Sequence, residues 1–334
     1  MARLRVGVIG LGRMGQIHAR HLAELPEAHL VVVGSRRPQV AAQVAAQLGT
    51  DWAEGYEPVL ERRDLDAIVI ATATCDHVQH IVQAAERGLA IFCEKPIALT
   101  LEETDQALAA VERAGVPLMV GFMRRFDPPY ERAKALIEAG AIGRPVMYKG
   151  VNRDPQWPAH EDDDPAVSGG FFVDMGVHDY DLAQWLMNSP IIRVHAVGGA
   201  LVYPQLATVG DVDNGLVNVV FANAALGNID VSRNARYGYD IRTEVLGDEG
   251  ALWIGTIQQT PLLVLDRSGV RHDVYPWFPE RFAHAFKREM AAFVQGVLAE
   301  KPLSPSGEDG RRALAVALAV KQSYTTGQPV DVQE

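Results

Sequence analysis

The tripeptide Glu94-Lys95-Pro96 places a lysine where it could take part in chemistry. It comes directly after a short apolar run that ends at Cys93. A lysine held by stiff backbone next to proline could stabilise a developing alkoxide or pass a proton. The same residues are also consistent with a surface Lys–Glu ion pair, which contributes little to stability. For Lys95 alone, both interpretations stay open.

A carboxylate and an imidazole stand four residues apart in the second half of the chain. Asp174 and His178 follow the paired glycines 169 and 170, and we expect one helix through both, continuing to Met187. Two such side chains share a helix face, and a carboxylate raises the basicity of a neighbouring imidazole. This is what a general base near neutral pH requires. The alternative is a hydrogen-bonded core histidine, which the neighbouring glycines and carboxylates make less attractive.

The first glycines of the chain form the pattern of a dinucleotide site. The pattern G-x-G-x-x-G follows the apolar run 4–9, and residues 16–25 are predicted to be a helix that ends before Pro26. The first glycine permits a tight turn, the second lets backbone approach a pyrophosphate, and the third lets helix pack on strand. The helix N-terminus then faces the negative charge. The expected cofactor-binding residues of the motif are Gly10, Gly12, Arg13, Met14 and Gly15.

The choice of cofactor depends on the end of the second strand. NAD-binding folds commonly carry an acid there for the ribose 2′-hydroxyl, whereas this chain has Ser35, Arg36 and Arg37. Guanidinium groups match phosphate oxygens in pairs, so the pattern favours the 2′-phosphate of NADP. Alternatively, both arginines are solvated residues that open the helix 38–48, and either NAD or NADP is accepted.

Further cofactor contacts are expected where the next strands end. Thr72, Ala73 and Thr74 follow the strand 66–71 at its carboxyl end, where open α/β sheets bind ligands. Their small side chains and hydroxyls could contact ribose or nicotinamide. His77 could approach the cofactor or be merely solvated. Glu94, with Lys95, follows the strand 89–93 and is expected at the same edge.

The order of predicted elements divides the chain into two domains. In residues 1–121 strands alternate with helices, which indicates a Rossmann-type, doubly wound parallel sheet, and a capping box at Thr100 and Glu103 opens its last helix. In residues 122–334, five short strands between 191 and 274 have no crossover helices, which indicates an open, mainly antiparallel sheet with helices near 280–298 and 308–325. We expect this α+β domain to bind the substrate and to pair with other subunits, giving a homodimer or homotetramer.

Composition narrows the possible partners. The chain has 334 residues and a formal net charge of -11, which argues against nucleic acid or an anionic membrane as partner. Two cysteines, Cys75 and Cys93, make no disulfide framework, and no third histidine or cysteine stands at ligand spacing, so we expect no metal and a cytoplasmic location. The first ten residues resemble a strand rather than a signal peptide. The acidic run 161–164 is expected in a solvated loop or a lid.

Together, these residues resemble the glucose–fructose oxidoreductase / inositol dehydrogenase (Gfo/Idh/MocA) family. The resemblance covers nearly the whole chain. It is carried by the amino-terminal glycine motif, by Glu94-Lys95-Pro96 and by the segment from glycines 169 and 170 to His178. Within the family the chain is most similar to the inositol 2-dehydrogenases, through residues 121–127 and 237–240.

The resemblance implies an NAD(P)-dependent dehydrogenase that oxidises a ring secondary alcohol of a cyclitol, myo- or scyllo-inositol, to a ketone. It implies that Lys95, Asp174 and His178 form the catalytic trio and contact the substrate. His178 would take the hydroxyl proton and Lys95 would stabilise the alkoxide, or the two would exchange these roles. The remaining substrate contacts that it implies are Arg125, Asn152, Asp154 and Tyr237.

Two other functions stay open. Residues 152–154 read Asn-Arg-Asp, where the inositol enzymes usually carry His-Arg-Asn, so the substrate could be a pyranose or a charged sugar derivative. A charged substrate would need a cationic partner, and the candidates are Arg125, Arg153, Arg233 and Arg236. The other alternative is an NAD(P)-binding sensor without turnover, although such a protein has no need for a base beside the nicotinamide.

Overall fold

The computed structural model describes residues 3–156 and 165–333, and the chain divides into two units. The first unit comprises Met1–Phe126 and His284–Arg311, and the second comprises Asp127–Ala283 and Arg312–Glu334. This division differs from a single cut after residue 121 because a C-terminal segment returns to the first unit. The acidic run 161–164, expected in a solvated loop or lid, lies outside the described residues.

The first unit is built on a six-stranded parallel sheet in the order β3-β2-β1-β4-β5-β6. Its strands are β1 (Leu4–Ile9), β2 (Ala28–Ser35), β3 (Asp51–Glu54), β4 (Ala67–Ile70), β5 (Ala90–Glu94) and β6 (Leu118–Gly121). Every residue of β4 and β5 is buried, as expected for strands covered on both faces. The predicted doubly wound sheet is therefore confirmed. The edge strand β3 was not predicted, because its short sequence is polar and largely exposed.

Helices connect successive strands of this sheet. They are α1 (Arg13–Glu24), α2 (Pro38–Leu48), α3 (Glu57–Leu60), α4 (Thr74–Glu86) and α5 (Leu101–Ala114). Thr100 caps α5 as predicted, since the Glu103 N–H donates to its hydroxyl at 3.2 Å. The reciprocal bond differs from that of a capping box, because the Glu103 carboxylate accepts from the Thr100 hydroxyl at 3.0 Å and not from its backbone N–H. Helix α1 begins three residues earlier than predicted.

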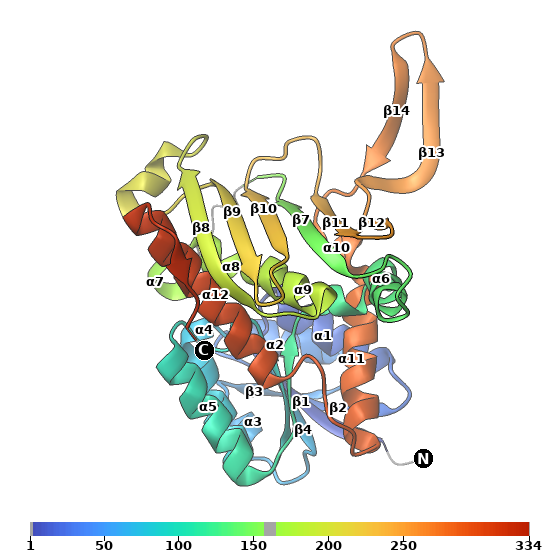
Figure 1. The fold of residues 1–334 in the computed structure, drawn as a ribbon. Coiled ribbons are helices and arrows are strands. Elements are labelled where there is room, and N and C mark those ends of the chain that lie inside the picture. The colour runs from blue at the N-terminus through green and yellow to red at the C-terminus, as the bar shows by residue number, and fades with distance from the viewer. Residues whose placement is uncertain (1–2, 157–164, 334) are drawn as a thin grey trace. The chain divides into compact units, whose positions relative to one another are not determined.

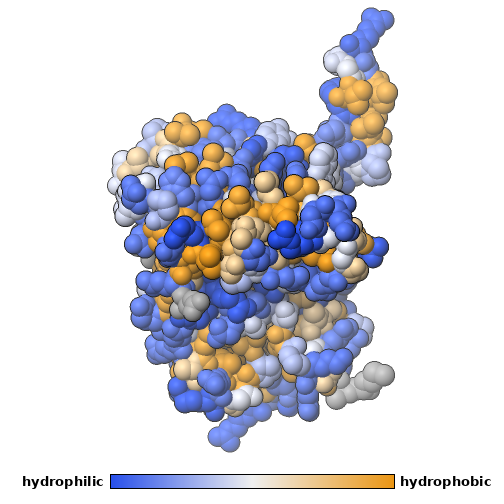
Figure 2. All heavy atoms as spheres, in the orientation of Figure 1, coloured by the Kyte–Doolittle hydropathy of each residue, from blue (hydrophilic) through white to orange (hydrophobic). Residues whose placement is uncertain are grey.

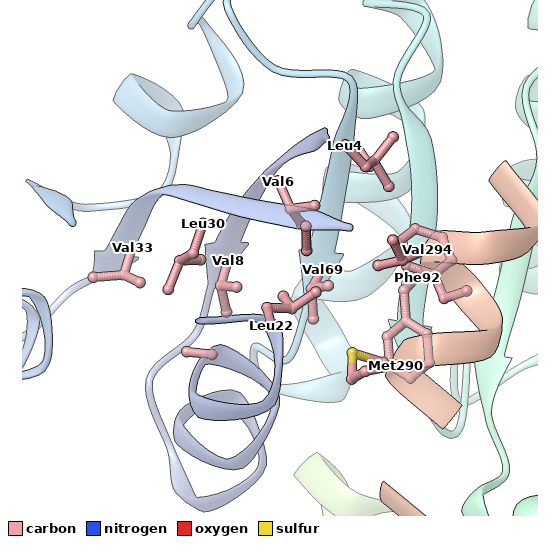
Figure 3. Packing of buried hydrophobic residues seen from close by; sticks show 14 of the residues in the cluster. Leu4, Val6, Val8, Leu22, Leu30, Val33, Val69, Phe92, Met290 and Val294 are labelled. Atoms are coloured by element: carbon pink, nitrogen blue, oxygen red, sulfur yellow. The ribbon is translucent and has the colours of Figure 1, made fainter. Parts of the chain in front are cut away.

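A helix from the C-terminal part of the chain completes the core of the first unit. Helix α11 (Ala283–Leu298) places Met290 and Val294 against Phe92 of β5, next to Val6 and Val69 of the neighbouring strands (Figure 3). All of these side chains are almost inaccessible to solvent. Burying a side chain of this size stabilises a fold by about 1.5–3 kcal/mol, so α11 is an integral part of the first unit.

The second unit contains a seven-stranded sheet in the order β12-β11-β7-β10-β9-β8-β15. Its strands are β7 (Pro145–Arg153), β8 (Ile191–Gly199), β9 (Asn214–Phe221), β10 (Leu226–Ser232), β11 (Asp240–Gly247), β12 (Ala251–Ile254) and β15 (Val330–Asp331). The prediction of a mainly antiparallel sheet is confirmed, with one exception: β7 and β10 pair in parallel. The chain reaches β10 only after the hairpin of β8 and β9, so β10 enters beside β7 in the same direction.

One face of this sheet carries helices. The helices of the second unit include α6 (Pro128–Glu138), α7 (Pro165–Ser168), α8 (Phe171–Asp174), α9 (Val177–Met187), α10 (Phe278–Arg281) and α12 (Gly307–Thr326), of which α12 begins in the first unit. The prediction of one helix through Asp174 and His178 is wrong: α8 ends at Asp174, and α9 begins three residues later. The break contains Gly176, whose Cα lies so close to the Phe172 carbonyl oxygen that a Cβ would stand 2.6 Å from it.

A separate hairpin extends from the second unit. Strands β13 (Gln258–Asp266) and β14 (Gly269–Val274) pair only with each other and project away from β11 and β12 (Figure 1). This hairpin was not predicted. Among the described residues of the chain, no helix has the length and apolar composition needed to cross a membrane.

Candidate active site

The three glycines of the dinucleotide motif have three different surroundings. Gly10 has a φ of +88°, and a Cβ there would stand 2.3 Å from the Ala71 carbonyl oxygen. A Cβ on Gly15 would stand 1.8 Å from the Gly10 carbonyl oxygen, so helix and turn pack too closely for any side chain. A Cβ on Gly12 would meet no protein atom within 4 Å. The space above Gly12 is therefore open to a ligand, as the motif predicts.

The N-terminus of α1 is suited to an anion. Gly12 is its N-cap, so no side chain caps it, and its first turn contains no acidic residue. Arg13 and Met14 lie in this turn, where backbone N–H groups and the helix dipole favour negative charge. These features fit the pyrophosphate of a dinucleotide, which Gly10, Gly12, Arg13, Met14 and Gly15 would hold.

The residues after β2 form a local network. The Ser35 hydroxyl accepts the Arg37 N–H at 3.1 Å, so its oxygen orders the turn. The Arg36 guanidinium lies 5.6 Å from the centre of the Tyr56 ring, and its Nη1 is 3.6 Å from an oxygen of Asp76. The side chain of Arg36 is nevertheless mostly exposed. The guanidinium is thus oriented by its neighbours and still accessible to a ligand.

His77 is not solvated: it is buried and contacts two segments of the backbone. Its Nδ1 lies 2.9 Å from the Pro96 carbonyl oxygen, and its Nε2 lies 3.1 Å from the Thr72 carbonyl oxygen. Burial lowers the pKa of this ring, so it is held neutral and can donate to only one of the two oxygens. The ring links the loop after β4, where Thr72, Ala73 and Thr74 lie, to the segment that follows Lys95.

Glu94 is the last residue of β5 and Lys95 follows it, so both lie at the carboxyl end of this strand, but Glu94 is not a surface residue. Its Oε1 is 2.6 Å from the Nε2 of His18 in α1, and its Oε2 accepts the Lys95 backbone N–H at 3.3 Å. The peptide bond between Lys95 and Pro96 is cis. Lys95 itself is partly exposed at the carboxyl edge of the sheet.

Arg125 lies in the first unit, in the 3₁₀ turn Met123–Phe126 that follows β6. It is largely buried, and its Nη2 is 3.2 Å from Asp309 of the returning C-terminal segment. Its charge is therefore already matched by a carboxylate.

In the second unit, Asp174 and His178 stand on two consecutive helices. Asp211 accepts the Phe171 N–H through both of its oxygens, at 3.0 and 3.2 Å, and so holds the N-terminus of α8. The carboxylate of Asp174, at the other end of this helix, is 40% exposed and lies 3.5 Å from the Nη2 of Arg233. His178 is the second residue of α9 and is partly exposed.

The side chain of Asn152 is hydrogen-bonded to α9 and to the residues before it. This buried residue of β7 donates its amide N–H groups to Asp179 Oδ2 at 2.6 Å and to the Met175 carbonyl oxygen at 3.2 Å. Asp179 is buried as well. Since both amide hydrogens are used within the protein, Asn152 could contact a polyol only through its carbonyl oxygen.

Tyr237 lies in a different cluster of the second unit. Its hydroxyl accepts from Arg153 at 3.1 Å and donates to Asp240 at 2.8 Å, while Arg153 also pairs with Asp230. Successive residues of a strand face opposite sides, so Arg153 and Asn152 point to opposite faces of the sheet. A hollow of about 540 Å³ is lined by Arg153, Asp230 and Tyr237 together with Leu216.

The last predicted substrate contact, Asp154, follows β7. Its backbone N–H donates to the Ser232 carbonyl oxygen, and its own carbonyl oxygen accepts the Ala235 N–H, both at 2.8 Å. Within the second unit the structure thus gathers Asn152, Asp174 and Arg233 around Met175, and it places Tyr237 with Arg153.

Three residues of this region were not predicted from the sequence: His18, Asp179 and Asp211. One signal in the sequence pointed to His18: it is a histidine inside the helix that opens with the glycine motif. In the described part of the chain, no group of three histidine, cysteine or acidic side chains is arranged to hold a metal ion.

Comparison with known families identifies the class of protein. Residues 4–122 match the model described as "Oxidoreductase family, NAD-binding Rossmann fold", and residues 134–332 match "Oxidoreductase family, C-terminal alpha/beta domain". Both are models of the Gfo/Idh/MocA group. The chain belongs to this family of oxidoreductases, and its first half is the NAD-binding domain, as the resemblance predicted.

Individual relatives are similar over their full length. The chain is 41% identical to the scyllo-inositol 2-dehydrogenase (NAD(+)) of Bacillus subtilis, covering 99% of this chain and 96% of that protein. It is 35% identical to the myo-inositol 2-dehydrogenase of Thermotoga maritima, covering 99% of both. A crystal structure of scyllo-inositol dehydrogenase from Lactobacillus casei, with bound NAD(H) and scyllo-inositol, is 30% identical and matches with a TM-score of 0.93 over 98% of this chain and 99% of that chain.

Proposed function

We propose that this protein is an NAD(P)-dependent dehydrogenase of inositols, and that scyllo- or myo-inositol is its substrate. The observation that carries the proposal is the 41% identity, over almost the entire chain, with an enzyme named for this reaction on scyllo-inositol. The cradle at Gly10, Gly12 and Gly15 supports the cofactor half of the proposal.

In the proposed reaction, a ring carbinol loses its hydroxyl proton and a hydride, and it becomes a ketone. His178 takes the proton from the hydroxyl as general base, and Asp174 stabilises the imidazolium that results. Lys95 donates a hydrogen bond to the reacting oxygen and favours its alkoxide form. The oxidised nicotinamide, when bound, supplies the acceptor for the hydride at its C4 carbon. Lys95 and His178 could exchange roles, since both can hold a proton at that oxygen.

Three of the four candidate arginines favour a neutral polyol over a charged sugar derivative, and the fourth, Arg236, is exposed. Arg125, Arg153 and Arg233 each lie within ion-pair distance of a carboxylate, respectively Asp309, Asp230 and Asp174. An anionic substrate would compete with these carboxylates, and removing the partner of a largely buried charge, as at Arg125 and Arg233, is costly. A neutral cyclitol needs only hydrogen bonds.

Reduction of the cofactor, followed by absorbance, tests the proposal. The panel contains scyllo-inositol, myo-inositol and common pyranoses, each with NAD and with NADP. We expect turnover on at least one inositol. His178→Ala should lower kcat by about 10²–10⁴-fold while cofactor affinity is retained. Turnover on pyranoses alone would show that the substrate is a sugar and not an inositol. Loss of cofactor affinity in His178→Ala would assign that residue a structural role.

We also propose that the cofactor site accepts the 2′-phosphate of NADP in addition to NAD. No carboxylate stands among Ser35, Arg36 and Arg37, and the guanidinium of Arg36 is oriented by Tyr56 and mostly exposed. Asp76 lies near the same guanidinium and offsets part of its charge, which would keep the site open to both cofactors.

The test of this cofactor proposal compares Arg36→Ala with the control Arg87→Ala, an exposed arginine at the end of α4. Removing a charge-assisted hydrogen bond of about 1.5–3 kcal/mol should raise the KM for NADP by about 10–100-fold. The KM for NAD should change little. Equal effects on both cofactors, or no turnover of wild type with NADP, would contradict the proposal.

We propose further that the protein is a homo-oligomer built through its second unit. The face of the seven-stranded sheet that carries no helices exposes Leu216, Leu226 and Trp253, the last of which is 85% exposed. The β13–β14 hairpin is also apolar, and Figure 2 shows hydrophobic residues gathered along it. Its exposed members are Leu262, Leu263, Val264, Leu265 and Val270. A two-stranded hairpin is only marginally stable by itself, so burial against a second copy would stabilise it.

A further inference from the structure

A buried histidine is linked through one carboxylate to the proposed catalytic lysine. His18 of α1 is fully buried, and its Nε2 lies 2.6 Å from Oε1 of Glu94. The other oxygen of Glu94 accepts the backbone N–H of Lys95 at 3.3 Å. A single carboxylate therefore joins His18 to the backbone that carries the lysine. All three residues belong to the first unit.

The surroundings leave the Glu94 carboxylate little freedom. The ring of His18 makes edge contacts with Phe92 and Phe286, whose centres are 5.1 and 6.2 Å away. Gly121 of β6 is also close, since a Cβ there would stand 3.0 Å from Glu94 Oε2. Any larger residue at 121 would press on the carboxylate. Glu94 itself is 9% exposed.

A second carboxyl group, that of Glu289, lies in the same region. Glu289 of α11 is fully buried and stands three residues after Phe286, so the two side chains share a helix face. Burial, and secondarily the negative charge of Glu94, raise the pKa of Glu289 well above its usual range. The raised pKa favours the protonated form of Glu289, whereas the Glu94 carboxylate has the hydrogen bond with His18.

We infer that His18 is a positioning residue for the dehydrogenase reaction: it anchors Glu94, and Glu94 holds Lys95 at the reacting oxygen. The inference rests on the proposed function. It assigns the histidine a task that is separate from cofactor binding, although it lies in the helix that opens with the glycine motif. A displacement of about 1 Å at a catalytic group can cost about 10²-fold in rate.

The test uses three substitutions in the full chain. His18→Leu removes the donor, His18→Gln keeps an N–H donor near the place of Nε2, and Glu94→Gln keeps the shape of the acid without its charge. We expect kcat to fall by about 10²-fold in His18→Leu. The kcat of His18→Gln should be at least tenfold higher than that of His18→Leu. The KM for NAD should stay within threefold of the wild-type value. Glu94→Gln should resemble His18→Leu.

A purely structural role for His18 would give a different result. It would lower the melting temperature in His18→Leu and leave kcat per folded molecule unchanged, and this outcome would overturn the inference. Equal kcat values in His18→Leu and His18→Gln would also overturn it. The matched control is His29→Leu, an exposed histidine on β2, which should leave kcat and both KM values as in wild type.

A second measurement needs no turnover. The rate at which acetic anhydride acylates Lys95 is read by mass spectrometry, with the exposed Lys301 of the same sample as internal reference. We expect this rate to change at least threefold in His18→Leu and to stay near the wild-type value in His18→Gln. An unchanged rate would overturn the inference. If wild-type protein turns over no polyol and the acylation rate still changes, the proposed function fails while the link from His18 to Lys95 stands.

Discussion

At the scale of single residues, glycines of the same motif are needed for different physical reasons. Gly12 borders open space, whereas Gly15 packs against the Gly10 carbonyl oxygen. We predict that Gly12→Ala leaves the melting temperature of the free protein within about 2 °C of wild type, because its methyl group meets no protein atom. The same methyl group would enter the space expected for the pyrophosphate, so the Kd for NADH, measured by calorimetry, should rise at least tenfold.

Gly15→Ala serves as the comparison. Its Cβ would stand 1.8 Å from a backbone oxygen, so the turn or the helix must shift, and the melting temperature of the free protein should fall clearly. If Gly12→Ala destabilised the free protein as much as Gly15→Ala does, the open space above Gly12 would not exist in solution.

The buried acid Glu289 predicts a dependence of stability on pH. Its pKa is raised by burial and by Glu94, so between the unfolded-state pKa of about 4.3 and the folded-state pKa only the folded protein keeps the proton. The contribution of this group to stability is therefore fully present below about pH 4 and is lost as the pH rises towards the folded-state pKa. Glu289→Gln, which cannot lose a proton, should melt a few degrees higher than wild type at pH 7–8 and at about the same temperature near pH 4.

Melting curves by circular dichroism between pH 4 and pH 8 check this prediction. The quantity that matters is the difference between the two melting temperatures at each pH, because other groups titrate equally in both proteins. A difference that stays constant over this range would mean that Glu289 has an ordinary pKa.

At the scale of elements, the short helix α8 depends on one acid outside it. Asp211 accepts the Phe171 N–H, and the helix ends at the proposed catalytic residue Asp174. We predict that Asp211→Ala lowers stability by about 1–2 kcal/mol, as the loss of a helix cap does, and lowers kcat at least tenfold. The Kd for NADH should not change, because the glycine cradle belongs to the other unit.

Asp211→Asn is the matched control, since it keeps an oxygen that can accept the same N–H. It should retain most of the wild-type kcat. Denaturant unfolding gives the stability of each variant, and steady-state kinetics with inositol gives kcat. A wild-type kcat in Asp211→Ala would separate the cap of α8 from the catalytic function of Asp174.

At the scale of the whole molecule, the helix-free face of the second sheet is the proposed contact between subunits. Trp253 is exposed on β12 of that sheet. We predict that Trp253→Glu lowers the molar mass measured by light scattering after size exclusion, because a buried charge without a partner weakens an apolar interface. The control is Trp52→Glu on β3 of the first unit, which is 48% exposed and should leave the mass as in wild type. A wild-type mass for Trp253→Glu, or a monomeric wild type, would contradict the prediction.

The local features of this protein were determined by its sequence. The strand, glycine turn and helix of residues 4–24, the alternation of strands and helices up to β6 except for β3, and the cap at Thr100 all follow from patterns within a few residues. Such patterns act through neighbouring backbone and burial period, so they can be recognised without knowing the rest of the fold. The same holds for the choice of Lys95, Asp174 and His178 as candidates, because their types and immediate neighbours suit acid–base chemistry.

Only the tertiary structure decided which distant residues meet. His18 and Glu94 are 76 positions apart, and Asn152 and Asp179 are 27 apart. The return of α11 to the first unit and the break between α8 and α9 were likewise not predictable from local patterns. The physical reason is that a buried polar group must find a partner, but its sequence neighbourhood does not say which one. Tertiary packing supplies those partners. It brings His18 to the carboxylate of Glu94, next to Lys95, and it brings Asp211 to the N-terminus of α8.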